Sequence, residues 1–379
     1  MKKNNEKVIS LALDYLRFPL ALIVVLVHVI NIDDVGVYIS GCRGGMITDG
    51  SSLYFIRHII NGFIRGISVP IYLFISGFVF FKGVDEYSIG VYKRKVHNRI
   101  HSLLIPYLIW NLLELLIVIF IHSTSLDAYS ASSYDLDLSL KNILSCFWVY
   151  NGQLIDSGVA AVQANTLFPL NTPLWFLRDL FCVTLISPLI YFVIKRLRFG
   201  VILSLFVLWI LPIFDSIPLL NQFVLVLFFF SIGAYMAIHK VDVADVFNRF
   251  RGVSVCIYCG CSILSVTMSN VIISNLLKSL SIIGALFVLY NLALRKVQSA
   301  TYKTSTFLST SSMFIYLAHS LICMRFYKIT LLIIEPNSNA GFFMCLVITY
   351  VVVITSLLFL YYMMRRYTPR FATILTGRK

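Results

Sequence analysis

The chain has 379 residues, of which 59% are hydrophobic and 13% charged, and its mean hydropathy is +0.87. Soluble globular domains contain about 25% charged residues, so this composition excludes them and indicates a protein that crosses the bilayer several times. The net charge of +14 would suggest nucleic-acid binding in a soluble protein. Here we expect Lys and Arg to collect in cytoplasmic loops, and we expect no nucleic-acid partner.

Ten apolar segments approach the roughly 20 residues that a helix needs to cross a hydrocarbon core about 30 Å thick. They predict an all-α integral membrane protein, a polytopic bundle of about ten transmembrane helices. The segments are 10–31, 62–82, 102–123, 173–194, 199–214, 222–239, 253–270, 277–294, 308–327 and 341–364. The fifth is short, and the seventh contains polar Ser and Thr residues.

The distribution of positive residues predicts how the bundle is oriented. With the N-terminus in the cytoplasm, 22 Lys and Arg residues lie on the inner side and 7 on the outer side. We therefore expect both termini to be cytoplasmic. The first segment has no cleavage signal after it, so we interpret it as an uncleaved helix and expect residues 1–379 to form a single transmembrane domain without an appended soluble domain. Two long outer loops, 32–61 and 124–172, are either solvated connections or covers for a polar ligand.

The first apolar segment carries Asp14, Arg17 and His28. Arg17 and His28 are eleven positions apart, so about three helical turns place them on one face, roughly 16 Å apart along the axis. Asp14 precedes Arg17 by three positions and can pair with it. A charge at the bilayer centre costs about 2.5–3.5 kcal/mol, so such residues indicate a pathway or a site. The alternatives are that Arg17 extends to the cytoplasmic headgroups and that His28 makes a structural hydrogen bond.

Two further segments predict close packing between helices. In the stretch 69–81, Pro70 is expected to bend the helix, and Ser76 with Gly77 allows another helix to approach. The stretch 228–234, FFFSIGA, has the same character.

Cys256, Cys259 and Cys261 have a spacing that resembles a metal site. Their surroundings are apolar and contain no His or carboxylate, which favours packing in the core. We therefore expect no metal site.

A basic run before the third span contains Lys93, Arg94, Lys95 and Arg99. It is either an orientation signal, a site for anionic lipid heads, or a site for a phosphorylated cytosolic ligand, because the Arg fork matches phosphate oxygens. Farther along the same span, Glu114 is an intramembrane carboxylate without an evident partner and is a candidate site residue.

The fourth and ninth spans add three candidates. Trp175 lies where an aromatic belt at the outer interface is expected. Arg178 either extends to that interface or faces a site; the adjacent Asp179 points about 100° away, so the two cannot share one helix partner. His319 is either a structural hydrogen-bonding residue or part of a site.

These stretches, in this order, resemble the acyltransferase 3 family of integral-membrane acyltransferases. The resemblance covers nearly the whole chain. It rests on Leu13-Asp14-x-x-Arg17-x10-His28, VPxxxFISGF at 69–78, the basic run ending in Pro106-Tyr107, LWFLR at 174–178, Gly233, IYLAHS at 315–320 and LTGR at 375–378. Family members often have Arg-x-x-Arg-x3-Pro before the third span; here Arg99 fits the first position and Ser102 replaces the second Arg, with His101 and Arg94 nearby.

The resemblance implies transfer of an acyl group, usually acetyl, from cytosolic acyl-coenzyme A to a hydroxyl of a cell-envelope glycan or its lipid-linked precursor. It implies a multi-pass protein of a bacterial inner membrane that works with the bilayer, the acyl donor, a carbohydrate acceptor and glycan-synthesis partners, without a permanently bound cofactor. Some relatives carry a fused extracytoplasmic domain that completes the transfer.

On this interpretation, the catalytic group is His28, Arg17 and Asp14. Arg17, Arg94 and Arg99 hold the phosphates of coenzyme A, and His28 is the general base or forms an acyl-imidazole. Candidates for contacting the acceptor or the oxyanion are Glu114, Trp175, Arg178 and His319. The competing hypotheses are a glycan transporter or flippase and a non-catalytic subunit of a polysaccharide-synthesis complex.

Overall fold

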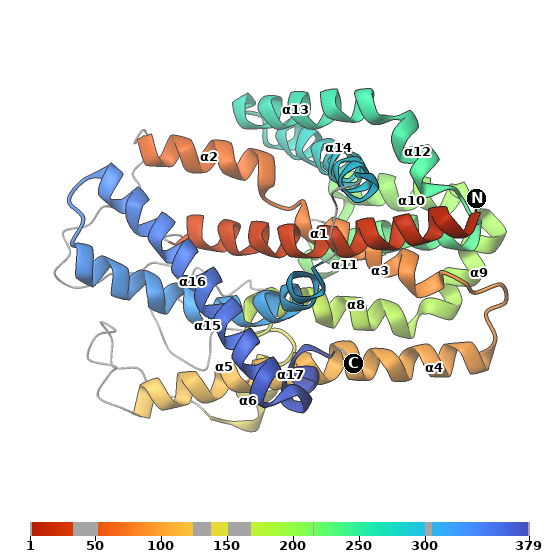
Figure 1. The fold of residues 1–379 in the computed structure, drawn as a ribbon. Helices are drawn as coiled ribbons and strands as arrows, with labels where there is room; N and C mark the ends of the chain where they lie inside the picture. The colour runs from red at the N-terminus through yellow and green to blue at the C-terminus, as the bar shows by residue number, and fades with distance from the viewer. Residues whose placement is uncertain are drawn as a thin grey trace. The chain divides into compact units, whose positions relative to one another are not determined.

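The computed structural model describes residues 2–32, 52–123, 138–150, 168–214, 216–299 and 305–377, and within these ranges its regular elements are all helices (Figure 1). Most of the two expected outer loops lies outside the described residues. The elements are α1 (Lys2–Ile30), α2 (Ser52–Ile64), α3 (Ser68–Phe81), α4 (Ile89–Arg99), η2 (Ile100–Leu104), α5 (Ile105–Ser123), α6 (Leu140–Cys146), η4 (Thr172–Leu174), α8 (Trp175–Leu185), α9 (Ser187–Leu197), α10 (Phe199–Ile210), η5 (Pro212–Phe214), α11 (Pro218–Ile238), α12 (Val243–Arg249), α13 (Arg251–Thr267), α14 (Val271–Gln298), α15 (Thr306–Ile334), α16 (Asn339–Tyr367) and α17 (Pro369–Thr376).

Seven of the described helical segments are long and apolar enough to cross a membrane, and the number rises to nine if each of two bent helix pairs is one span. The pairs are α8 with α9, bent by 67°, and α12 with α13, bent by 63°. The first bend falls just before Pro188, which cannot donate a backbone hydrogen bond to the preceding turn. The all-α, polytopic prediction is confirmed, while the cytoplasmic location of both termini stays a prediction.

The fifth expected span is the exception. Residues 199–214 form the 12-residue helix α10, which ends before Pro212. Its length of about 18 Å is well short of the hydrocarbon core. The residue before a proline is driven out of the helical region, and Leu211 is indeed extended, with a ψ of 141°. The prediction of ten spans is therefore corrected to at most nine among the described residues.

The described residues form two compact units. The first contains residues 1–23, 58–99 and 179–312, and the second contains residues 24–57, 100–178 and 313–379. Several helices, α1 among them, contribute to both units without a break.

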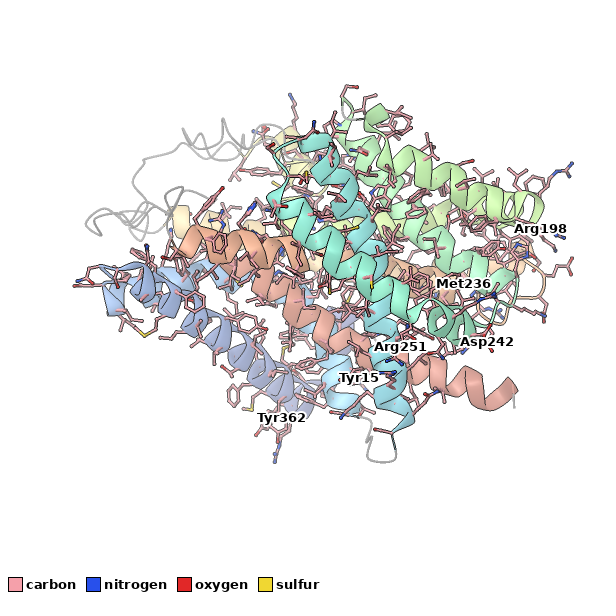
Figure 2. The ribbon with its side chains drawn as sticks, turned by 90° about the horizontal axis from the view of Figure 1, so that it is seen from above. Tyr15, Arg198, Met236, Asp242, Arg251 and Tyr362 are labelled. Carbon is pink, nitrogen blue, oxygen red and sulfur yellow. The ribbon has the colours of Figure 1, made fainter. Side chains whose placement is uncertain are left out.

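The core of the first unit is built from α1, α3, α11, α12 and α14. Its buried members include Leu13, Phe74, Met236 and Tyr290, and the partly buried Tyr15 packs against them. Figure 2 labels Tyr15 and Met236. The first half of α1 therefore buries one apolar face in a core, which holds the polar positions of the same helix at fixed places.

A reciprocal pair of glycines brings α3 and α11 together. A Cβ atom added to Gly77 would strike the backbone carbonyl of Phe230, and one added to Gly233 would strike that of Phe74. The close packing predicted for these two stretches is confirmed. Pro70 lies in the first turn of α3, where its missing N–H costs no helical bond; the chain breaks instead at residues 65–67, where Gly66 has a φ of 88°.

The loops that follow α3 and α11 are also joined. Lys240 Nζ lies 2.7 Å from a carboxylate oxygen of Asp85. The hydrogen bond and the attraction of the Lys240 charge lower the pKa of Asp85 below its ordinary value, and the same contact raises the pKa of Lys240. Both side chains are mostly exposed, so the pair adds little stability but joins the ends of the two crossing helices.

In the second unit, the C-terminal helix α17 packs on α5 (Figure 1). Trp110 donates from Nε1 to the carbonyl oxygen of Leu375 at 2.9 Å. Gly377 is left-handed, with a φ of 62°, and a Cβ there would lie 2.6 Å from the backbone of Ser102. Ser102 belongs to the π-helical turn η2, just before Pro106. The backbone contact explains why the C-terminal stretch 375–377 needs glycine; Arg378 lies outside the described residues.

We expect Gly77→Ala and Gly233→Ala each to destabilise the protein by about 1–3 kcal/mol, because the added methyl meets a rigid backbone carbonyl. Thermal unfolding of the detergent-purified protein measures this. The matched control is Gly260→Ala in α13, where an added Cβ has no atom of a described residue within 4 Å. This control should keep or raise the melting temperature, since Ala is the better helix former. Equal losses in all three variants would contradict the crossing.

Candidate active site

Asp14, Arg17 and His28 lie on one continuous helix, α1. The first two belong to the first unit and His28 to the second. Their spacing along α1 is that of the sequence prediction, about 16 Å from Arg17 to His28.

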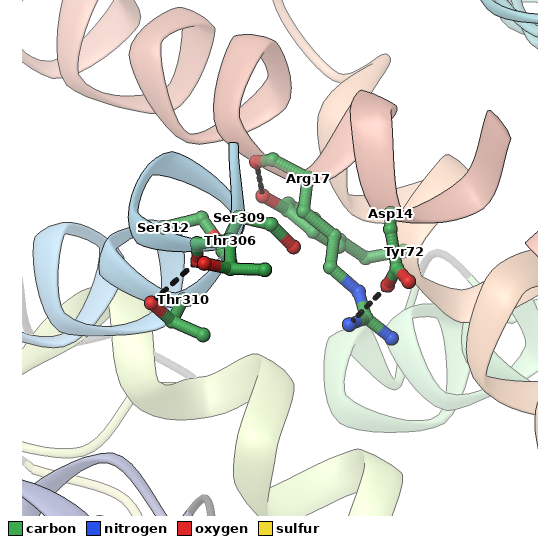
Figure 3. A network of polar contacts seen from close by, with 7 residues as sticks. All are labelled: Asp14, Arg17, Tyr72, Thr306, Ser309, Thr310 and Ser312. Carbon is green, nitrogen blue, oxygen red and sulfur yellow. Dashed lines mark hydrogen bonds and ion pairs between the residues drawn. The ribbon is translucent and has the colours of Figure 1, made fainter. Parts of the chain in front are cut away.

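Arg17 forms the expected ion pair with Asp14. The distance from Nη1 to the carboxylate is 2.7 Å, and the Arg17 and Asp14 side chains are 27% and 38% exposed. Tyr72 of α3 donates its hydroxyl to the backbone carbonyl of Arg17 at 2.5 Å, which holds α1 against α3. Figure 3 shows the guanidinium beside the Asp14 carboxylate, in the same view as the hydroxyl-rich first turns of α15, which include Ser309. Arg17 is therefore oriented by α1 itself and by α3.

Of the other predicted phosphate-binding residues, Arg99 lies near Arg17. It is half-buried at the end of α4, and its charge is close enough to Arg17 for the two guanidiniums to act on one another. Its guanidinium also stacks 5.6 Å from the ring centroid of Phe80, as the Lys95 ammonium does at 4.9 Å. Arg94 lies on the exposed face of α4. The first unit thus gathers more positive than negative charge around Arg17.

In the second unit, the ring of His28 faces that of His319 on α15. The ring centroids are 4.9 Å apart and the planes are inclined by 53°. His28 is half-buried and His319 is fully buried. The sequence offered both histidines as candidates but had no signal that they meet.

The hydrogen bonds of His319 determine its tautomer. Its Nδ1 lies 2.7 Å from the carbonyl oxygen of Tyr316 and 3.2 Å from that of Ile315. Both oxygens can only accept, so Nδ1 carries the proton in the neutral ring and Nε2 carries a lone pair. Nε2 is buried and has no hydrogen-bond partner among the described residues. Buried nitrogens of this kind usually have a hydrogen-bond partner, and a role of His319 in a site stays a prediction.

Glu114 of α5 has an ion-pair partner on another helix. Arg325 of α15 lies 3.6 Å from one of its carboxylate oxygens, which corrects the expectation of a carboxylate without an evident partner. Arg325 also donates to the carbonyl of Leu321. The second carboxylate oxygen is buried without a hydrogen-bond partner among the described residues, so a role in contacting substrate stays a prediction.

Arg178 does not extend to an outer interface. Its side chain is 4% exposed, donates to the carbonyl of Trp148 and lies 5.2 Å from the centroid of that ring. Asp179 instead accepts from Gln222 Nε2 at 2.6 Å, so the two adjacent residues have different partners, as predicted. Trp175 is half-buried, 6.2 Å from the ring of Phe168. The alternative that Arg178 extends to the outer interface is therefore wrong, because its guanidinium contacts the backbone carbonyl and the ring of Trp148 inside the fold.

A buried polar network in the second unit was missed by the sequence analysis. Asn111 of α5 accepts the backbone N–H of Asn171 at 3.2 Å, and Ser320 of α15 donates to Asn171 Oδ1 at 2.6 Å. Tyr316, one turn before, donates its hydroxyl to the carbonyl of Pro173. The only available signal was the presence of Asn in an otherwise apolar segment.

The three cysteines with metal-like spacing do not pack in the core. Cys256 and Cys259 are exposed on α13 and Cys261 is half-buried, so the expectation of core packing is wrong. One face of α13 is left outward because α14 covers the other. In the described part of the chain, no group of three His, Cys, Asp or Glu side chains is placed to hold a metal ion.

Comparison with known proteins gives the class to which this arrangement belongs. The acyltransferase 3 family model, described as an acyltransferase domain, matches residues 10–363. The chain therefore belongs to this family, and the match runs through both units and includes His28, Arg17 and His319.

A curated relative is the succinoglycan biosynthesis protein ExoH of Rhizobium meliloti (strain 1021), which is 29% identical over 185 residues. The alignment covers 48% of this chain and 44% of that protein, so the chain spans less than half the length of this relative. No solved structure matches the chain.

A double-mutant cycle tests whether Glu114 and Arg325 stabilise the protein as a coupled pair. We expect Glu114→Gln and Arg325→Gln each to lower the free energy of unfolding by about 1–3 kcal/mol, because each leaves one charge without its counter-charge in the bundle. The double variant should lose at least about 1 kcal/mol less than the sum, as measured by chemical unfolding in detergent. Additive losses would show that the pair is not coupled.

Proposed function

We propose that this protein is a multi-pass membrane acyltransferase that moves an acyl group from acyl-coenzyme A to a hydroxyl of a cell-surface polysaccharide or its lipid-linked precursor. The observation that carries the proposal is the pair of facing imidazoles, His28 and His319, in a chain that belongs to an acyltransferase family. The name of the relative, a succinoglycan biosynthesis protein, supports a polysaccharide acceptor, and acetyl is the acyl group that we expect. We place the protein in a bacterial inner membrane.

The donor end of the proposed site is Arg17 with Arg99 and Arg94. Two guanidiniums that repel one another are stabilised by an anion between or beside them, and the fork of Arg matches phosphate oxygens. Asp14 keeps one side of the Arg17 guanidinium engaged, at 2.7 Å, and so orients the other side toward the donor. We therefore assign the phosphates of the acyl donor to this positively charged group of the first unit.

The chemical step is assigned to His28. Its imidazole takes the proton of the acceptor hydroxyl while the oxygen attacks the thioester carbonyl carbon; the carbon–sulfur bond then breaks, and the imidazolium returns the proton to the leaving thiolate. An acyl-imidazole intermediate is the covalent variant. His319, whose Nδ1 is held by Tyr316, keeps a lone pair beside His28. This lone pair can accept a hydrogen bond from the His28 ring or from the acceptor hydroxyl.

Replacing the base should abolish transfer without unfolding the protein. We expect His28→Ala to lower the rate of acyl transfer by at least about 100-fold, the range of a lost general base. His58→Ala, a histidine on the exposed face of α2, is the matched control and should retain the wild-type rate. The measurement is thiol release from acetyl- and succinyl-coenzyme A by protein in lipid nanodiscs. Full activity of His28→Ala would remove His28 from the mechanism.

Arg17 is tested through the donor. We expect Arg17→Ala to raise the KM for acyl-coenzyme A at least about tenfold, and Arg17→Lys to restore it only in part, because an ammonium cannot make the bidentate contact. Arg196→Ala, an exposed residue of α9, should leave the KM unchanged. A KM that does not respond to Arg17→Ala would contradict phosphate binding there.

The proposed function as a whole is tested on the envelope. Deleting the gene should remove ester-linked acyl groups from an envelope glycan, and the wild-type gene should restore them, as measured by mass spectrometry of the glycans. Two results together would favour a transporter instead: the deletion strain keeps all its acyl esters, and the purified protein releases no thiol from acyl-coenzyme A.

A further inference from the structure

The carboxamide of Asn171 is held in place by the protein, although one of its hydrogen-bonding groups has no partner among the described residues. Asn171 is 1% exposed, and the hydroxyl of Ser320 donates to its Oδ1 at 2.6 Å. Its backbone N–H is accepted by Asn111 Oδ1 at 3.2 Å. With the backbone and Oδ1 both engaged, the direction of Nδ2 is determined.

Nδ2 of Asn171 is a buried donor with no hydrogen-bond partner among the described residues. A buried polar group left without a partner costs about 1–3 kcal/mol. The surrounding hydrogen bonds hold the group in place against this cost, which indicates that a group other than the described residues completes it.

The same stretch of α15 presents a second unsatisfied group of the opposite kind. His319, the neighbour of Ser320, is fully buried and keeps an Nε2 lone pair without a hydrogen-bond partner in the described part of the chain. Tyr316, on the same helix, contacts both His319 and the carbonyl of Pro173, two residues after Asn171. His319 Nε2 therefore needs a hydrogen-bond donor, and Asn171 Nδ2 needs a hydrogen-bond acceptor.

Hydroxyl groups meet both needs, because each can donate and accept. A thioester carbonyl or an ionised phosphate only accepts, so these two groups of the acyl donor can satisfy Asn171 but leave His319 without a partner. We propose that Asn171 Nδ2, positioned by Ser320, binds a hydroxyl oxygen of the carbohydrate acceptor beside the histidine pair. This inference rests on the proposed acyl transfer and assigns Asn171 as an acceptor-binding residue, with Ser320 as its positioning residue.

Asn171→Asp is the sharpest test, since it keeps the shape and the Oδ1 acceptor and replaces only the donor nitrogen. Each variant is measured in two assays. The first quantifies the acyl esters that the variant restores to the envelope glycans of the deletion strain, at equal protein level. The second measures thiol release from acetyl-coenzyme A by the variant in nanodiscs, with water as the acyl acceptor (thiol release to water). We expect Asn171→Asp to lower glycan acylation at least about tenfold and to change thiol release to water by less than about twofold.

The matched control is Asn291→Asp. Asn291 is also a buried Asn, 4% exposed, but its Nδ2 already donates to the carbonyl of Phe247 at 2.8 Å. We therefore expect wild-type glycan acylation from any Asn291→Asp protein that folds. If Asn171→Asp does not accumulate, Ser320→Ala carries the test, because it keeps the carboxamide but releases its orientation. We expect a smaller loss of glycan acylation, about two- to tenfold, with thiol release to water unchanged.

Wild-type glycan acylation in Asn171→Asp, or in Ser320→Ala where it stands in, would overturn the inference and leave the proposed function intact. Loss of glycan acylation and thiol release by the same factor would also overturn it, since that pattern belongs to a contact with the thioester. A wild-type gene that restores no acyl esters would overturn the proposed function and this inference with it.

Discussion

The rule that buried polar groups must find hydrogen-bond partners governs this structure. Several buried polar side chains have partners on other segments of the chain: Arg178 with Trp148, Glu114 with Arg325, and Ser320 with Asn171. Against that background, buried atoms without such a partner are informative. Among the described residues, His319 Nε2 and Asn171 Nδ2 are two of these atoms, and both come from the segments around the same stretch of α15.

The first helix contributes a candidate residue to each compact unit. Its N-terminal half is packed in the apolar core of the first unit and carries Arg17, which Asp14 and Tyr72 orient. Its C-terminal half belongs to the second unit and carries His28, which meets a second imidazole. The tight crossing of Gly77 and Gly233 holds α3 against α11 within the first unit, where Tyr72 of α3 contacts Arg17.

In the proposed mechanism, the two histidines have different tasks. The carbonyl of Tyr316 keeps the proton of His319 on Nδ1, so this ring presents a lone pair and not a donor. Two neighbouring imidazoles resist being protonated together, since like charges at close range repel. One ring that takes a proton beside one that stays neutral is the state that base catalysis requires.

The sequence by itself determined the class of fold, the apolar segments, the Asp14–Arg17 pair and the helix-packing role of Gly77 and Gly233. These follow from hydropathy and from contacts within one or two helical turns, which are local properties of the chain. The tertiary structure decided that residues 199–214 are too short to span, that Glu114 meets Arg325, that His28 meets His319, and that Asn171 is held by Asn111 and Ser320. These contacts join positions far apart in the chain, and helical periodicity says which face a residue occupies but not which other helix lies against that face.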